Sequence, residues 1–174
     1  MSNVAIRRRL ANLVLVVALV AAFTMHLPPP AALACDDEAG TVSSCTGPDG
    51  AADDALWMLR RVVAAMQADE PHALRMVSRG EGGFRTLDLY VFCIGAANGR
   101  VSAHPEPMLV GQDARQLRDP DGKAFAAEML DVAKEGSVSE VHYLYPRPGS
   151  PVAVPKTSFV TRIKDQVCGV GYYE

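Results

Sequence analysis

Two short runs, DLYVFCI at residues 88–94 and QVCGVGYY at residues 166–173, are the strongest indication of fold in this sequence. Both are rich in aromatic and β-branched residues, which favour strands. Each also carries one cysteine, Cys93 in the first run and Cys168 in the second. A cysteine within each apolar strand suggests that the two runs begin and end one sheet and that a disulfide bond joins them.

The N-terminal segment has the pattern of a secretory signal peptide. A cluster of three arginines at residues 7–9 precedes an apolar stretch over residues 10–25, and the small-x-small pattern Ala-Leu-Ala follows at residues 32–34. We therefore expect cleavage after Ala34 and a periplasmic or secreted protein. Two alternatives stay open. The apolar stretch of about 16 residues can serve as an uncleaved anchor, although a span needs roughly 20, and cleavage would expose Cys35 for lipidation.

Charge and length limit the classes of partner and the number of domains. Removal of residues 1–34 would take away three arginines and no acid, so the formal net charge would change from −3 to −6. An acidic chain is a poor partner for nucleic acid or an anionic membrane surface, which attract clustered Lys and Arg. We expect a signal peptide over residues 1–34, a flexible arm over residues 35–50 and a single domain over residues 51–174.

All four cysteines lie in the part expected to be exported, where disulfide bonds persist. Four cysteines allow three pairings. We favour Cys93 with Cys168, because both lie in strands, and Cys35 with Cys45, because both lie in the segment before the first helix. A zinc site is the alternative, but the sequence has no CxxC pair and its histidines are scattered.

Apolar periodicity predicts the helices. Leu56, Leu59, Val63 and Met66 recur at helical spacing after two aspartates, so a helix should run from about residue 53 to residue 70, with Trp57 packed in it. Pro71 can open a short second helix that ends at Gly80. A later helix should open at residues 121–122, present Phe125, Met129 and Val132 on one face, and stop at Gly136.

Alternation with a period of two predicts the strands. Residues 89–94 and 100–104 should form a hairpin around a type I′ turn at Asn98-Gly99. Residues 105–120 should then form a loop that packs over another part of the domain. Residues 138–145, 156–163 and 166–173 should form a three-stranded meander. Asp113, Asp119 and Asp121 do not match the spacing of an EF-hand and fit turns and a helix cap better than a calcium site.

Six ordered motifs between residues 88 and 173 resemble the single Cache domain of the second type. This is the extracytoplasmic ligand-sensing module of bacterial chemoreceptors and sensor kinases, which also occurs as stand-alone exported proteins, the form expected here. The matching motifs are DLYVFC, ANGRVSAHP, LVGQD, LRDPDGKAF, PKTSFV and VCGVGYY. The resemblance implies an α+β, PAS-like fold with a five-stranded antiparallel sheet in the order 2-1-5-4-3, a long N-terminal helix and a crossing helix. That order makes the first and last strands neighbours, as a Cys93–Cys168 bridge requires.

The resemblance also implies a small organic acid bound between the sheet and the loop and helix that cross it. Lys156 can pair with a carboxylate, His104 ends the second strand, and Ser158 has the same parity as Lys156. Tyr143 and Tyr145 share a strand face, and Arg85 can cap the pocket. Each also has a structural alternative, such as core packing for a tyrosine or a solvated position for Arg85.

The sequence gives little support for an enzyme. It contains no GxSxG elbow, HExxH motif or P-loop, and we expect no cofactor and no metal. Our first hypothesis is a sensor-type binding module for a small carboxylate, with a role in chemotaxis or signal transduction and a membrane receptor or a second copy as partner. The alternatives are a structural or interaction protein that keeps the fold without a ligand, and an unrecognised exported enzyme.

Overall fold

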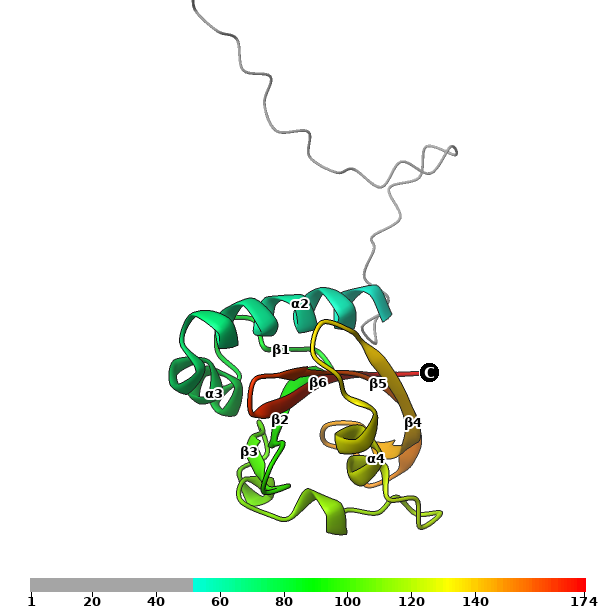
Figure 1. The fold of residues 1–174 in the computed structure, drawn as a ribbon. Helices are drawn as coiled ribbons and strands as arrows, with labels where there is room; N and C mark the ends of the chain where they lie inside the picture. The colour runs from blue at the N-terminus through cyan, green and yellow to red at the C-terminus, as the bar shows by residue number, and fades with distance from the viewer. Residues whose placement is uncertain (1–51) are drawn as a thin grey trace, which may run out of the picture. The chain divides into compact units, whose positions relative to one another are not determined.

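The computed structural model describes residues 52–174, which form one antiparallel sheet with helices on both faces (Figure 1). The strands follow the order β1-β2-β6-β5-β4, and β3 also pairs with β2. Their bounds are β1 Arg85–Thr86, β2 Leu89–Gly95, β3 Val101–Ala103, β4 Ser139–Pro146, β5 Ala153–Ile163 and β6 Gln166–Tyr173. The α+β class and the expected neighbours of each strand are confirmed. The two-residue strand β1, which adds a sixth strand, was not predicted.

Two helices cover one face of the sheet, α2 (Ala52–Ala68) and α3 (Glu70–Arg79). The break between them lies at Asp69, whose carboxylate accepts a hydrogen bond from the backbone N–H of His72, and Gly80 ends α3 at φ 67°. The buried stripe of α2 is rotated from the predicted one, since Met58 and Val62 are fully buried. Leu56 and Val63, expected in that stripe, are only partly buried.

The expected packing of Trp57 is wrong. Its side chain is 58 % exposed, and the guanidinium of Arg61 lies 4.5 Å from the ring centroid. Trp57 lies between two buried positions of α2 but points away from the sheet. A stacked arginine covers one side of the ring without removing the other from water.

The turn between β2 and β3 differs from the predicted type I′ turn. Such a turn needs positive φ at two residues, but only Gly99 has one, at 66°. The loop closes instead through Gly95, whose N–H bonds to the carbonyl of Arg100 and whose carbonyl accepts from Gly99 N–H, both at 2.8 Å. The second strand is consequently shorter than predicted, and His104 follows its end.

The opposite face of the sheet is covered by α4 (Phe125–Val132) and by the segment that leads to it, with short helices η1 (Pro107–Leu109) and η2 (Ala114–Gln116). α4 starts later than predicted. Asp119 accepts hydrogen bonds from the backbone N–H groups of Asp121 and Lys123 and so holds a turn where the helix was expected to begin. Asp121 is therefore not the helix cap.

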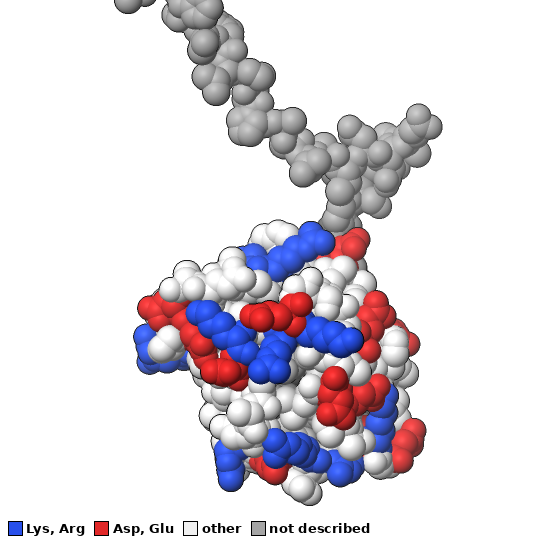
Figure 2. Space-filling model, in the orientation of Figure 1, with Lys and Arg blue, Asp and Glu red and all other residues white. Residues whose placement is uncertain are grey.

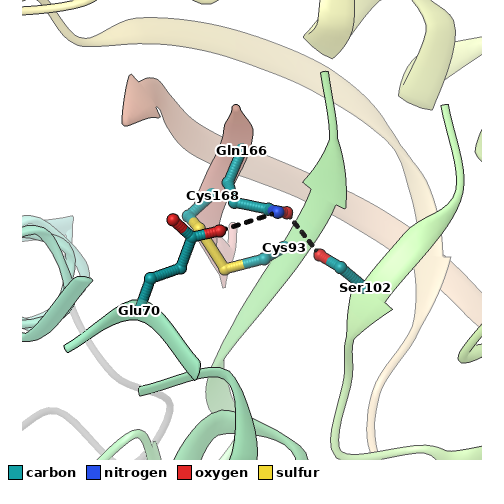
Figure 3. Close-up of a disulfide and its surroundings, with 5 residues drawn as sticks. All are labelled: Glu70, Cys93, Ser102, Gln166 and Cys168. Atoms are coloured by element: carbon teal, nitrogen blue, oxygen red, sulfur yellow. Dashed lines mark hydrogen bonds between the residues drawn. A yellow bond between two sulfur atoms is a disulfide. The ribbon is translucent and has the colours of Figure 1, made fainter. Parts of the chain in front are cut away.

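The sheet separates two apolar cores. One contains α2, α3 and the residues of β2 and β6 that face these helices, including both cysteines. The other contains α4, Ile94, Val141 and Val160. Cys93 and Cys168 are directly opposite each other in the β2–β6 register and form a fully buried disulfide bond (Figure 3). This confirms the predicted pairing.

Beside the disulfide, a chain of polar side chains joins three elements (Figure 3). Ser102 donates to Oε1 of Gln166 at 2.6 Å, and Nε2 of Gln166 donates to Glu70 at 3.1 Å. The network ties β3, β6 and the start of α3 together. On the molecular face in Figure 2, basic and acidic side chains are interspersed over the described residues, so this face carries no extended basic field.

The signal peptide, the flexible arm and the Cys35–Cys45 pair lie outside the described residues and stay predictions. Over residues 52–174, no helix has the length and apolar character needed to cross a membrane.

Candidate functional site

Lys156 lies on β5, on the sheet face that α4 covers, opposite Tyr143 of β4 and Tyr173 of β6. The residue is 1 % exposed. Its ammonium donates hydrogen bonds to the hydroxyls of Tyr90, at 3.0 Å, and Tyr173, at 3.1 Å. It also faces the rings of Tyr90, Tyr173 and Tyr145, at 4.2, 4.3 and 5.4 Å from their centroids. Three tyrosines thus form a cage around a buried cation.

Two glycines of β6 leave space for side chains of neighbouring strands, Gly171 for Lys156 and Gly169 for Phe92. A Cβ atom at Gly171 would lie 2.6 Å from Ser158 Oγ and closer still to Lys156 Cε, and one at Gly169 would lie 2.6 Å from Phe92 Cζ. Real Cβ atoms do not approach other atoms so closely. The absence of a side chain at Gly171 therefore allows the Lys156 side chain to pack directly against the backbone of β6.

The surroundings of Lys156 disfavour its charge. Burial lowers the pKa of Lys156 to about 7, because the ammonium loses its hydration; the Asp88 carboxylate opposes the shift, and the Arg147 guanidinium adds to it. Asp88 and Arg147 also pair with each other at 2.6 Å. Among the described residues no carboxylate lies within ion-pair distance of Lys156.

His104 lies beside the cage, with its ring edge-on to Tyr90 at 5.1 Å between centroids. Its Nδ1 accepts a hydrogen bond from the backbone N–H of Glu106 at 2.8 Å, so the proton of a neutral ring lies on Nε2. Burial, together with the positive charge of Lys156, lowers the pKa of His104 to about 4. The ring is therefore a neutral N–H donor near pH 7. The hydrogen bond from Glu106 also ties the ring to the loop that follows β3.

A small cavity of about 40 Å³, here called the inner cavity, lies between the sheet and α4. Its polar groups come from His104, Tyr90, Tyr143 and Tyr145, and the rest of its surface is apolar: Phe92, Ile94, Val101, Leu109, Leu117, Phe125, Ala126 and Met129. Lys156 is not among the lining residues. Roughly three waters fill such a volume, so a solute of only a few heavy atoms fits without rearrangement.

A second space of about 270 Å³, the outer chamber, adjoins the inner cavity at Tyr90, His104 and Tyr145. Arg85 borders this chamber and not the inner cavity. Its remaining walls come from Pro105, Glu106 and residues 146–150. Arg85 is therefore placed for the cap role that the sequence suggested, at a distance from Lys156.

Tyr143 and Ser158 contact each other. Their hydroxyls lie 2.9 Å apart in the core, and burial raises the pKa of Tyr143 despite this hydrogen bond. The Tyr143 ring stacks on Phe125 of α4 at 4.3 Å, and Tyr145 meets the same ring edge-on at 5.8 Å. Ser158 thus holds Tyr143, while both tyrosines combine core packing with a cavity-facing position.

The structure brings five of the six predicted residues together around the inner cavity and its cage and leaves Arg85 outside. Sequence reasoning missed Tyr90 and Tyr173, the two hydroxyls that Lys156 contacts. In the strand DLYVF, Tyr90 and Phe92 are two residues apart and so share a sheet face. This alternation could have identified Tyr90 from the sequence. Tyr173 has no local signal of this kind, since its closeness to Lys156 depends on the β5–β6 register.

Asp119 is a buried acid in the same half of the domain. Burial alone would raise its pKa, but hydrogen bonds from the backbone N–H groups of Leu144, Lys123 and Asp121 lower it overall. The carboxylate thus organises a turn against β4, as a turn-forming residue should. Over residues 52–174, no group of three or more potential ligands is arranged to hold a metal ion.

Comparisons with known proteins identify related sequences. The family model described as Single Cache domain 2 matches residues 64–173. Over 85 residues the chain is 35% identical to the methyl-accepting chemotaxis protein McpP of Pseudomonas putida, and this alignment covers 47% of the chain and 16% of McpP. The chain thus matches only about a sixth of that protein's length.

Solved structures of sensor domains are similar in sequence and fold. The periplasmic sensor domain of a chemotaxis protein is 30% identical, with a TM-score of 0.54, over 70% of this chain and 88% of that one. A Cache chemosensory domain described as recognising carboxylic acids is 27% identical, with a TM-score of 0.54, over 70% and 86%. A methyl-accepting chemotaxis protein of Vibrio parahaemolyticus, 20% identical with a TM-score of 0.57 over 70% and 86%, shows the fold alone.

Proposed function

We propose that this chain, which belongs to the Single Cache domain 2 family, is an extracytoplasmic sensor domain that binds a small organic acid. The observation that carries the proposal is the buried cation of Lys156, which lies behind a mainly apolar cavity. A buried cation without an anionic partner is energetically unfavourable, and a carboxylate bound nearby would offset that cost.

The cavity provides hydrogen-bond donors suited to a carboxylate. Neutral His104 offers its Nε2 proton, and Tyr145 offers a hydroxyl. Tyr143 contributes a wall, and Ser158 fixes its position. Arg85, at the outer chamber, can attract an entering anion and cap the site. These assignments give a role to each of these five residues, all of which belong to the set predicted from the sequence.

The dimensions of the inner cavity favour a short acid. Its volume of about 40 Å³ and its apolar wall suit a small carboxylate with a short aliphatic part. A carboxylate ligand is also consistent with the relative described as recognising carboxylic acids. A longer acid would extend into the outer chamber.

A location outside the cytoplasm and a role in chemotaxis or signal transduction complete the proposal. The matched relatives include a periplasmic sensor domain and part of a chemoreceptor. The buried Cys93–Cys168 bond fits an oxidising compartment. A membrane receptor or a second copy of the chain would pass the signal on.

A thermal-shift screen tests this proposal directly. Protein purified from cells expressing the full chain is heated with acetate, propionate, butyrate or succinate, and with amines and amino acids as comparison compounds. Binding to the folded state raises the melting temperature. We expect a rise with at least one carboxylate, reduced in Lys156→Met and retained in Tyr172→Phe, a control on the opposite face of β6. If no carboxylate raises the melting temperature, or Lys156→Met responds as wild type does, the proposal fails.

A further inference from the structure

Tyr90 connects Lys156 to the inner cavity. Lys156 donates to two hydroxyls, and within the described domain only one of these two tyrosines, Tyr90, borders the cavity; Tyr173 borders neither space. We propose that Tyr90 is the residue that contacts the bound carboxylate and that Lys156 is a positioning residue that acts through Tyr90. This inference rests on the proposed function and specifies how its site recognises an anion.

The hydrogen bonds around the cage determine which proton is available. The hydroxyl of Tyr173 donates to the carbonyl of Pro146 at 2.7 Å, so its oxygen can only accept from its other neighbours. Lys156 donates to both phenol oxygens. Tyr90 accepts from Lys156, and the proton of its own hydroxyl is the one that can turn to a new acceptor. A carboxylate in the inner cavity is a stronger acceptor than a phenol oxygen.

The charge of Lys156 controls the direction of that proton. A protonated lysine donates to the Tyr90 oxygen, which leaves the Tyr90 proton for the ligand. A neutral amine has a lone pair and can accept from Tyr90, which turns the proton away from the cavity. Because the pKa of Lys156 is about 7, affinity for an anion should fall as pH rises above that value, by roughly tenfold per pH unit.

The tyrosines around Lys156 and His104 titrate away from this range. Burial raises the pKa of Tyr90 and Tyr145, while that of Tyr173 rises to about 12 and that of His104 falls to about 4. Tyr143 is likewise raised. Charged groups near the cage include Asp88 and Arg147, which form an ion pair, and Glu106, which follows His104. On another side, Lys156 borders a pocket whose titratable and charged groups are Asp119, Asp121, Lys123, His142 and Glu174.

A double-mutant cycle separates action through Tyr90 from direct contact with Lys156. Acetate binding is measured calorimetrically at pH 6 for wild type, Tyr90→Phe, Lys156→Met and the double variant, with Tyr172→Phe as control and acetamide as the uncharged comparison ligand. We expect each single variant to bind acetate about tenfold more weakly, and the double variant to bind no worse than the weaker single variant. Losses that multiply to about a hundredfold, or an unaffected Tyr90→Phe, would overturn the inference.

A pH profile supplies a second test that leaves Lys156 in place, in case Lys156→Met does not fold. Between pH 6 and 9, acetate affinity of wild type should fall above about pH 7, whereas that of Tyr90→Phe should be nearly independent of pH. If the acetate affinity of Tyr90→Phe falls with pH as steeply as that of wild type, the inference is contradicted but the proposed function stands. Absence of carboxylate binding in wild type contradicts the proposed function itself.

Discussion

The two faces of the sheet use the same strands for different purposes. On the α2–α3 face, Val91, Cys93 and Val170 pack against helices, and the disulfide bond lies within that core. On the α4 face, the alternate residues of these strands include Tyr90 and Tyr173, which contact Lys156 of β5, and a cavity remains. The packed first face thus supplies the stability that allows the second to bury a poorly compensated cation.

Loss of the disulfide bond should have the largest effect on stability and little effect on recognition. Substitution of Cys93 and Cys168 by alanine removes a crosslink between residues 75 positions apart. We expect the free energy of unfolding to fall by about 2–5 kcal/mol, the usual cost for a small exported domain. Denaturant unfolding measures this loss. If acetate affinity of the still-folded protein falls as much as it does in Tyr90→Phe, the two faces are not independent.

Lys156 should make the stability of the empty domain depend on pH. Its pKa is about 7 in the folded protein and 10.5 in an ordinary environment, so between these values the unfolded chain binds a proton that the folded chain does not. Stability therefore rises with pH across this window. The free energy of unfolding of wild type, relative to Lys156→Met, should increase by a few kcal/mol, on the order of 1.4 kcal/mol per pH unit at most.

The exposed Lys134 provides the matched control for this measurement, since Lys134→Met should show no such rise relative to wild type. Saturating acetate should also reduce the increase in the unfolding free energy of wild type with pH, because a bound anion favours the protonated form of Lys156. A pH-independent difference between wild type and Lys156→Met would contradict the assigned environment of the ammonium.

Gly171→Ala should disturb the α4 face specifically. The added Cβ conflicts with Lys156 Cε and Ser158 Oγ, and such overpacking costs about 1–3 kcal/mol. Acetate affinity should fall as well, because the lysine is displaced from the cage. Val170→Ala, on the other face of β6, is the comparison: it should lower stability and leave affinity unchanged. Equal affinities of Gly171→Ala and wild type would show that the cage adapts.

The smallest effect is expected from two serines, one near each core. Ser158→Ala removes the partner of the Tyr143 hydroxyl, and Ser102→Ala breaks the bond to Gln166 near the disulfide. Each should cost about 1 kcal/mol of unfolding free energy, the typical net value of one hydrogen bond. Only Ser158→Ala should also weaken acetate binding. A change in binding of the same size in Ser102→Ala would remove the distinction between the faces.

Local patterns predicted most of the elements but not their ends. Period-two alternation identified β2, β4, β5 and β6, and Pro71 with Gly80 located α3. The predicted type I′ turn at Asn98-Gly99 was wrong because the same dipeptide also fits a longer loop, in which only Gly99 needs a positive φ. The start of α4 was wrong because Asp119 accepts hydrogen bonds from the backbone N–H groups of Asp121 and Lys123 and holds a turn there. Its further bond from Leu144 N–H, which ties this turn to β4, is tertiary and leaves no local signal.

Alternation along the chain was enough to predict which residues share a strand face and, with the family resemblance, that Cys93 lies next to Cys168. The contacts of Lys156, in contrast, depend on the folded sheet. Tyr90 is 66 residues away from it and Tyr173 is 17 residues away, and only strand order and register bring their hydroxyls to its ammonium. Alternation specifies the direction of a side chain, whereas burial and pKa depend on every neighbour that folding brings to it.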